Sequence, residues 1–316
     1  MDDHQRLKMD LLRARFVEAM TAWNWSPRSV VSYEQNVRYF FDWLERETEI
    51  EDLARVTAET MVSYQTALLA VERPDGGRLS VGTQRHRLGA LKSFFGYLWR
   101  EGKVLMNPAS QVVLPKRRKQ LPRANLTPKE AIRLLEAVGT STPLAMRDRA
   151  ILELLYATGI RNAEIRALTL ADVCETTLTI RAGKGGKDRV VPMGRVAEAA
   201  LSDYLQEARP KLAMKDGVLN IFLTKHGLPL DSYAVINAVR RAVRAAGIKK
   251  AIHPHSLRHA CATHMLRGGA DIRYIQKLLG HASLQTTQLY TLVEISDLKA
   301  VHRLYHPRER RRGLTR

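Results

Sequence analysis

One proline-bounded stretch near residue 120 divides this sequence into two halves that fold separately. Pro115 and Pro122 enclose the polar, strongly basic run Lys116-Arg117-Arg118-Lys119-Gln120. Proline at both ends disfavours a helix, and the residues between are polar. We therefore expect a first domain over residues 1–112, a basic linker over residues 113–123 and a second domain over residues 124–316.

The first half has the apolar period of α-helices. Apolar residues recur at helical spacing over about residues 10–23, in a helix that Ser26-Pro27 begins, over about residues 58–71, and in a fourth helix that Ser80 opens. Another face of the fourth helix carries Arg85, Arg87 and Lys92. That basic face is either simply solvated or turned toward DNA.

The second half combines helices with a short β-hairpin. Thr127-Pro128-Lys129-Glu130 predicts a capped helix start, and residues 147–157 predict a second helix that Gly159 stops. The period then changes to two on both sides of the glycine-rich turn Gly183-Lys184-Gly185-Gly186-Lys187, which is typical of a hairpin. Helices resume afterwards. The expected fold class is mainly α with a small β-sheet in the C-terminal domain.

The charge of the chain favours a polyanionic partner. Lys and Arg number 51 against 32 Asp and Glu, which gives a net charge of +19 and a pI near 10.2. Neutralising phosphates releases condensed counterions, but charge alone does not choose between DNA and RNA. Cys174 and Cys261 form no disulfide framework and no C-x-x-C pair, which suits a reducing cytoplasm. No apolar signal region and no run of about 18 apolar residues is present, so we expect no membrane role.

Two motifs place cations where a phosphate can reach them. Arg161 follows Gly159 at the start of a helix, where free backbone N–H groups favour anions and a guanidinium can bind two phosphate oxygens. The alternative is a surface arginine paired with Glu164. Lys184, at the hairpin tip, can reach into a groove and protonate a leaving oxygen, although exposed turn lysines are common.

A third motif pairs a titratable group with a phosphate-binding one. In His253-Pro254-His255-Ser256-Leu257-Arg258-His259, Pro254 suits the first turn of a helix and puts His255 and Arg258 on one face. His255 and His259 also have a spacing that zinc ligands use. However, no Glu lies between them as in H-E-x-x-H, and no Cys is close by in sequence, so zinc is the weaker interpretation.

The last two motifs supply a histidine and a possible nucleophile. His281 follows Gly280, which ends a helix that Asp271 is expected to cap, and Tyr290 comes nine residues later. A tyrosine hydroxyl, with an ordinary pKa of about 10, needs a base or cations nearby to attack phosphorus near neutral pH. A lone tyrosine on a helix is usually a core residue. The prediction of a catalytic site therefore rests on the order of the five motifs and on their occurrence in one chain.

Taken together, these residues resemble the tyrosine recombinase (phage integrase) family, and most of all its short Xer-type members. The ordered signature of that family is complete here as Arg161, Lys184, His255 with Arg258, His281 and Tyr290. The surrounding Thr-Gly-Ile-Arg-x-x-Glu, Gly-Lys-Gly and Leu-Gly-His sequences match as well, and the resemblance covers nearly the whole chain. It implies a SAM-like, core-binding helical domain followed by a catalytic domain.

The resemblance also implies a mechanism. Tyr290 would attack the scissile phosphate and form a 3′-phosphotyrosyl link, with neither metal nor ATP. The other implied roles are Arg161 and Arg258 on the non-bridging oxygens, His255 as base, Lys184 as acid, His281 as a hydrogen-bond donor and Glu164 as the group that orients the cluster.

The implied partner is double-stranded DNA with paired recombination sites, bound by a homotetramer or by a heterotetramer with a related recombinase. We expect a cytoplasmic, nucleoid-associated protein. The expected DNA contacts are Arg85, Arg87, Lys92, Lys116, Arg117, Arg118 and Lys187. A short apolar stripe over about residues 294–305 (Ile295, Leu298, Val301 and Leu304) is expected to dock on a neighbouring protomer as an exchange helix, or else on its own domain.

Two other functions remain as alternatives. A DNA-binding accessory protein without catalysis would form no covalent adduct, and a type IB topoisomerase would use similar chemistry without paired sites. Within the family, chromosome dimer resolution, transposon or plasmid resolution and element integration all stay open.

Overall fold

The computed structural model describes residues 3–73, 76–116, 126–181, 188–214, 217–280 and 295–310. The chain divides into two compact units, Met1–Leu121 and Pro122–Arg316. No helix in the described ranges is long and apolar enough to cross a membrane. The linker arginines, the hairpin tip and the segment with His281 and Tyr290 lie outside these ranges.

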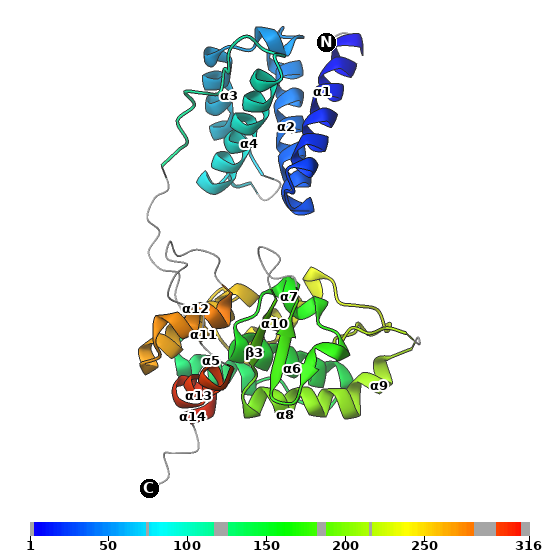
Figure 1. Cartoon of the computed structure of the whole chain (residues 1–316), viewed down its shortest axis with the longest axis vertical. Helices are drawn as coiled ribbons and strands as arrows, with labels where there is room; N and C mark the ends of the chain where they lie inside the picture. The colour runs from blue at the N-terminus through cyan, green and yellow to red at the C-terminus, as the bar shows by residue number, and fades with distance from the viewer. Residues whose placement is uncertain are drawn as a thin grey trace. The chain divides into compact units, whose positions relative to one another are not determined.

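The first unit is a bundle of four helices, drawn from blue to cyan in Figure 1. The helices are α1 (Asp3–Ala22), α2 (Pro27–Glu47), α3 (Ala58–Ala70) and α4 (Val81–Arg100), with a 3₁₀ turn at Leu53–Arg55. As expected, the side chains of Ser26 and Ser80 cap α2 and α4 by accepting hydrogen bonds from backbone N–H groups three residues on. Aromatic side chains fill the core: Phe16 meets Phe94 with ring centroids 5.4 Å apart, edge to face.

Helix α1 begins earlier than its apolar period predicts. The expected start was near residue 10, whereas the helix begins at Asp3. Its first turns are polar and form ion pairs with other parts of the unit, Arg6 with Glu45 and Lys8 with Asp52. A helical segment that is held by ion pairs has no apolar period, so the sequence pattern did not predict it.

The residues after α4 lie against the first unit. Three side chains donate hydrogen bonds to backbone carbonyls there: Gln65 to Val113 (3.2 Å), Arg85 to Pro115 (2.6 Å) and Lys92 to Val112 (3.0 Å). The first residues of the expected linker are therefore tied to α3 and α4. The bounds 113–123 of that linker stay a prediction, because residues 117–125 lie outside the described part.

The second unit is built around one buried helix, α6 (Pro143–Thr158). All residues from Ala150 to Thr158 are buried, and α6 packs against α5, α8, α10 and α11 (Figure 1). The other elements are α5 (Pro128–Glu136), α7 (Asn162–Ala167), a 3₁₀ turn (Leu170–Asp172), α8 (Arg195–Asp203), a π-helical turn (Tyr204–Ala208), α9 (Arg209–Leu212), α10 (Ser232–Ala245), α11 (Pro254–Gly268), α12 (Ile272–Leu279), α13 (Ile295–Tyr305) and α14 (Pro307–Arg310).

The predicted hairpin is confirmed. Strands β2 (Thr177–Ile180) and β3 (Arg189–Pro192) pair antiparallel with Leu178 opposite Val191, and β1 (Val173–Cys174) adds a third, two-residue strand. A strand of two residues is too short to show a period, so β1 was not expected. The fold class, mainly α with a small sheet, is also confirmed.

Caps explain where the helices of this unit begin. Thr127 and Glu130 form the predicted capping box at α5, with bonds of 2.8 and 3.2 Å. Helix α6 begins at Pro143 rather than at the expected residue 147, because Thr142 caps it and Pro143 fits its first turn. Asp271 caps α12 as predicted, accepting a bond of 2.8 Å from the backbone N–H of Arg273.

The tail helices lie against their own unit, where α13 contacts α11, α12 and β3 and α14 contacts α8 and α11. The expected apolar stripe is only partly right, since Leu298 is 4% exposed but Leu304 is 61% exposed. Two histidines, His302 and His306, occupy the buried face instead. Helix α13 ends at Tyr305, and Pro307 begins α14, because proline suits the first turn of a helix.

Candidate active site

Arg161 stands at a sharp junction between α6 and α7. Gly159 ends α6 in the left-handed region, with φ of 62°. A Cβ on Gly159 would lie 2.5 Å from the Leu279 side chain, so both the conformation and the close approach of α12 require glycine here. The chain then turns, and Arg161 immediately precedes α7.

A single carboxylate, that of Glu164, holds two arginines in place. It accepts hydrogen bonds from the Arg161 side chain (2.7 Å) and backbone N–H (2.8 Å), and from both terminal nitrogens of Arg189 (3.0 and 2.8 Å). Burial raises the pKa of Glu164, but the bonds from Arg189 and Arg161 outweigh it and bring the pKa to about 2. Glu164 is therefore ionised at any pH near neutrality and fixes both guanidiniums.

Three arginines cap the C-terminal end of α12. The last carbonyls of a helix have no partner within it and carry the negative end of its dipole. Here the bonds are Arg189 Nε to the Leu278 carbonyl (3.2 Å), Arg258 Nη2 to the Leu279 carbonyl (2.8 Å) and Arg161 Nη2 to the Gly280 carbonyl (3.3 Å). The next residue in the chain is His281. The cluster thus fixes the backbone that leads into that histidine.

Helix α11 contributes Arg258 and His255. The Arg258 guanidinium is almost fully buried and also donates to the Gly159 carbonyl. Burial, with the nearby charge of Arg161, lowers the pKa of Arg258 to about 10, which still leaves it protonated at neutral pH. Partial burial and then the charges of Arg258, His259 and Arg161 lower the pKa of His255. A neutral imidazole able to accept a proton therefore lies beside a cationic cluster.

These charges can stabilise a phosphoryl group. Three guanidiniums surround one carboxylate in the arginine cluster of Arg161, Arg189, Arg258 and Glu164, which leaves a positive excess. Fixed cations aimed at developing negative charge lower a transition state without reorganisation during the reaction. The Arg161 side chain keeps 29% of its surface exposed, so a ligand can reach it.

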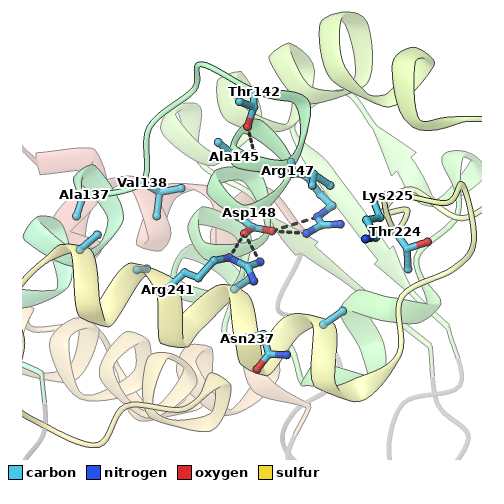
Figure 2. Close-up of a pocket in the computed structure, with 15 residues that line it drawn as sticks. Ala137, Val138, Thr142, Ala145, Arg147, Asp148, Thr224, Lys225, Asn237 and Arg241 are labelled. Atoms are coloured by element: carbon cyan, nitrogen blue, oxygen red, sulfur yellow. Dashed lines mark hydrogen bonds and ion pairs between the residues drawn. The ribbon is translucent and has the colours of Figure 1, made fainter.

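A cavity of about 580 Å³ lies elsewhere in the second unit, at the N-terminal end of α6 (Figure 2). Its charges pair with one another: Asp148 accepts from Arg147 (2.8 Å) and from Arg241 (3.0 Å), and Arg147 also donates to the Leu223 carbonyl (2.8 Å). About sixteen residues of helix, or roughly 24 Å, separate this end from Gly159. The cavity is not part of the arginine cluster.

Comparison with known proteins agrees with this geometry. Residues 124–296 match the phage integrase family, and residues 12–101 match the phage integrase, N-terminal SAM-like domain. Tyrosine recombinase XerC 2 of Ralstonia nicotianae is 44% identical over 292 residues, which is 92% of this chain and 84% of that one. Tyrosine recombinase XerD of Listeria innocua is 36% identical over 285 residues, 90% of this chain and 94% of that one.

The chain belongs to the phage integrase family. It is a site-specific tyrosine recombinase, as the motifs predicted. Two solved structures share the fold: a lambda integrase tetramer bound to a Holliday junction (TM-score 0.65, 17% identity, 90% of this chain and 80% of that one) and XerH bound to a difH substrate (TM-score 0.62, 23% identity, 92% and 83%).

The structure brings four of the predicted site residues together. Arg161, Glu164, His255 and Arg258 converge from α11 and the start of α7, close to the end of α12. Lys184, His281, Tyr290, Arg117, Arg118 and Lys187 lie outside the described residues. Within the described residues, no group of three or more His, Cys, Asp or Glu is placed to hold a metal ion.

The basic residues predicted to contact DNA in the first unit have internal partners. Arg85 and Lys92 donate to backbone carbonyls of the segment after α4, and Arg87 stacks over the Tyr39 ring at 4.3 Å. Lys116 lies exposed at the end of the described segment. Their contact with DNA stays a prediction.

Arg189 is the site residue that sequence reasoning missed. It lies opposite Ile180 in the sheet and two positions from the buried Val191, so it faces the same side of β3 as a core residue. A charge at a buried position of an alternating strand needs a partner. That signal could have identified it, and its partner is Glu164.

Proposed function

We propose that this recombinase binds two DNA sites and exchanges their strands through a covalent 3′-phosphotyrosyl link to Tyr290. The observation that carries the proposal is the arginine cluster. Arg161 and Arg189 bind the Glu164 carboxylate, and together with Arg258 they bind the helix end that leads into His281. Such a cluster suits a scissile phosphate, whose negative charge grows as the nucleophile attacks.

The individual roles follow from the position and charge of each group. Arg161 and Arg258 bind the non-bridging oxygens, and Glu164 and Arg189 hold Arg161 in place. His255, neutral because its pKa is lowered, takes the proton of Tyr290. Lys184 protonates the leaving 5′ oxygen, and His281 donates a hydrogen bond to the phosphate. The energy of the broken phosphodiester stays in the tyrosyl link, so the proposed reaction uses neither ATP nor a metal.

The assembly and the biological task follow the relatives by analogy. The lambda integrase structure is a tetramer on a Holliday junction, and the XerH structure holds a difH substrate. We propose a tetramer here too, either of this chain alone or with a related recombinase, acting on the nucleoid in the cytoplasm. The net charge of +19 supports a DNA partner. Resolution of the Xer kind and recombination of a mobile element remain the two candidate tasks.

Trapping the covalent intermediate tests the central claim. A nicked suicide substrate loses the short strand needed for religation, so the tyrosyl adduct accumulates and is seen on a denaturing gel. The wild-type chain should give the adduct, whereas Tyr290→Phe should give none while binding the site as tightly, because only one oxygen is removed. A covalent band that persists in Tyr290→Phe would overturn the assignment of the nucleophile.

A further inference from the structure

The last turn of α6 has carbonyls that the helix itself cannot satisfy. The Leu155 carbonyl is taken by the backbone N–H of Gly159 at 3.2 Å. The next two carbonyls, of Tyr156 and Ala157, belong to residues that are fully or almost fully buried. A buried carbonyl without a donor destabilises the structure, so these two groups need partners from elsewhere.

Two tail histidines are those partners, and the Ala157 carbonyl also accepts a weak bond from the Cys261 thiol at 3.7 Å. His302 Nε2 donates to the Ala157 carbonyl at 2.9 Å, and His306 Nε2 donates to the Tyr156 carbonyl at 3.2 Å. A carbonyl only accepts, so each ring carries its hydrogen on Nε2. Both imidazoles are buried and stack on each other, with ring centroids 4.5 Å apart and nearly parallel planes. The tail therefore supplies a C-terminal cap for α6.

Two more tail side chains, both from α14, bind α6 and α8. Arg308 forms an ion pair with the fully buried Glu153 of α6, with Nε 3.0 Å from the carboxylate. Glu309 accepts a bond of 2.8 Å from the backbone N–H of Arg195, in the first turn of α8. Each of these tail groups satisfies a charge or a backbone group of the catalytic unit. A tail held only by apolar packing would not need a polar partner for each of these groups.

The capped turn leads directly into Arg161. Ala157 lies four residues before it, and between them the Gly159 carbonyl accepts a bond from Arg258. The tail histidines hold the backbone on one side of Gly159, and Arg258 holds it on the other. Gly159 lies close to the Leu279 side chain, since a Cβ added to it would be 2.5 Å away.

We propose that His302 and His306 are positioning residues for Arg161. By capping the last turn of α6, the tail sets the direction in which the backbone enters Arg161 and hence the place where its guanidinium meets the scissile phosphate. This inference rests on the proposed role of Arg161. We call the groups that the tail binds the tail seat: the Tyr156 and Ala157 carbonyls, Glu153 and the Arg195 backbone N–H. The inference makes the contribution of Arg161 to the cleavage rate depend on a tail bound in this seat.

The test uses substitutions in the full-length chain that differ in where a donor lies. His302→Leu and His306→Leu remove the donor. His302→Gln and His306→Gln put an amide N–H near the position of Nε2, whereas His302→Asn and His306→Asn place it nearer the backbone, where Nδ1 was. Asp297→Asn, at an exposed position of α13, is the matched control.

Two suicide substrates distinguish a misplaced Arg161 guanidinium from a general loss of folding or activity. One has the ordinary scissile phosphodiester, and the other has a methylphosphonate there, which lacks one charged oxygen and so depends less on a cation. On the phosphodiester, the Leu and Asn variants should cleave about 10- to 100-fold more slowly, the scale of a displacement of about an ångström. The Gln variants and Asp297→Asn should stay near the wild-type rate. On the methylphosphonate, the Leu and Asn variants should recover toward the wild-type rate, as Arg161→Ala should.

Arg161→Ala distinguishes the two possible failures. If Arg161→Ala is equally impaired on both substrates, its proposed role is overturned, and the inference falls with it. If Arg161→Ala recovers on the methylphosphonate but the Leu variants do not, the histidines serve folding alone and the inference is wrong. Should melting curves show that the Leu variants are unfolded, the Gln and Asn pair decides, and equal phosphodiester rates for the two would overturn the proposal.

Discussion

Replacement of Glu164 by Gln should destabilise the catalytic unit by a predictable amount. The substitution keeps the size of the side chain but removes the charge that four hydrogen bonds from Arg161 and Arg189 converge on. The pKa of Glu164 falls from 4.5 to about 2 on folding, and at about 1.36 kcal/mol per pH unit this is worth about 3 kcal/mol. Breaking a buried ion pair from one side typically costs a similar amount, about 3–5 kcal/mol.

The same pKa fixes the sign of the pH dependence. Because the folded-state pKa lies below the unfolded value, the stabilisation is complete above pH 4.5 and is lost as the pH falls toward 2. Gln does not titrate and lacks this contribution throughout. The difference in unfolding free energy between wild type and Glu164→Gln should therefore shrink, from about 3 kcal/mol at pH 7 to about 1.5 kcal/mol at pH 3.

Urea unfolding followed by two signals measures this cleanly. All four tryptophans (Trp23, Trp25, Trp43 and Trp99) lie in the first unit, so their fluorescence should report an unchanged transition. Far-UV circular dichroism should show the helices of the second unit unfolding at lower urea. Glu207→Gln, at an exposed position of the same unit, is the matched control. A loss below about 1 kcal/mol at pH 7, or a difference that does not change with pH, would refute the reasoning.

Three further expectations concern the same site. Gly159→Ala should cost about 1–3 kcal/mol and slow cleavage, because it adds a Cβ 2.5 Å from Leu279 at a positive φ; unchanged urea midpoints would contradict this. The lowered pKa of His255 predicts that the cleavage rate falls in acid with its inflection below pH 6.5, so a rate profile with its inflection above 6.5 would argue against His255 as the base. Lys184→Ala should lose cleavage but recover on a substrate with a 5′-thio leaving group, which departs without a proton, whereas Lys187→Ala should mainly weaken binding; rescue of Lys187→Ala instead would reverse the two roles.

The sequence predicted those features that depend on local chemistry. Ser26, Thr127 and Asp271 identified helix starts, because a cap needs only a side-chain oxygen and a nearby backbone N–H. The hairpin followed from its period of two. The catalytic motifs were predicted from their order and from the resemblance to the tyrosine recombinase family, because each motif alone is common.

Long-range pairings were beyond such reasoning. Arg189 meets Glu164 across 25 residues, and His302 meets the Ala157 carbonyl across 145. Neither contact has a periodic signature. The tail was expected to be an apolar stripe because hydrophobic spacing was the feature used to interpret that segment. A polar side chain that hydrogen-bonds a buried group far away in the sequence can be recognised as its partner only in the folded structure.

Because the tail makes polar contacts with buried groups, its removal should affect folding as well as assembly. If the tail only docked on a neighbouring protomer, truncation after Val293 would leave a chain that binds a single site and loses only assembly. In the structure, truncation takes Arg308 away from the buried Glu153, removes the His306 donor from the Tyr156 carbonyl and leaves the Ala157 carbonyl with the weak Cys261 thiol donor at 3.7 Å. Each unsatisfied buried group costs about 1–3 kcal/mol, a large share of the stability of a typical domain. A truncated chain that lost recombination would therefore say little about exchange between protomers, whereas single substitutions at His302 and His306 leave Arg308, Glu309 and Leu298 to hold the tail and test one contact at a time.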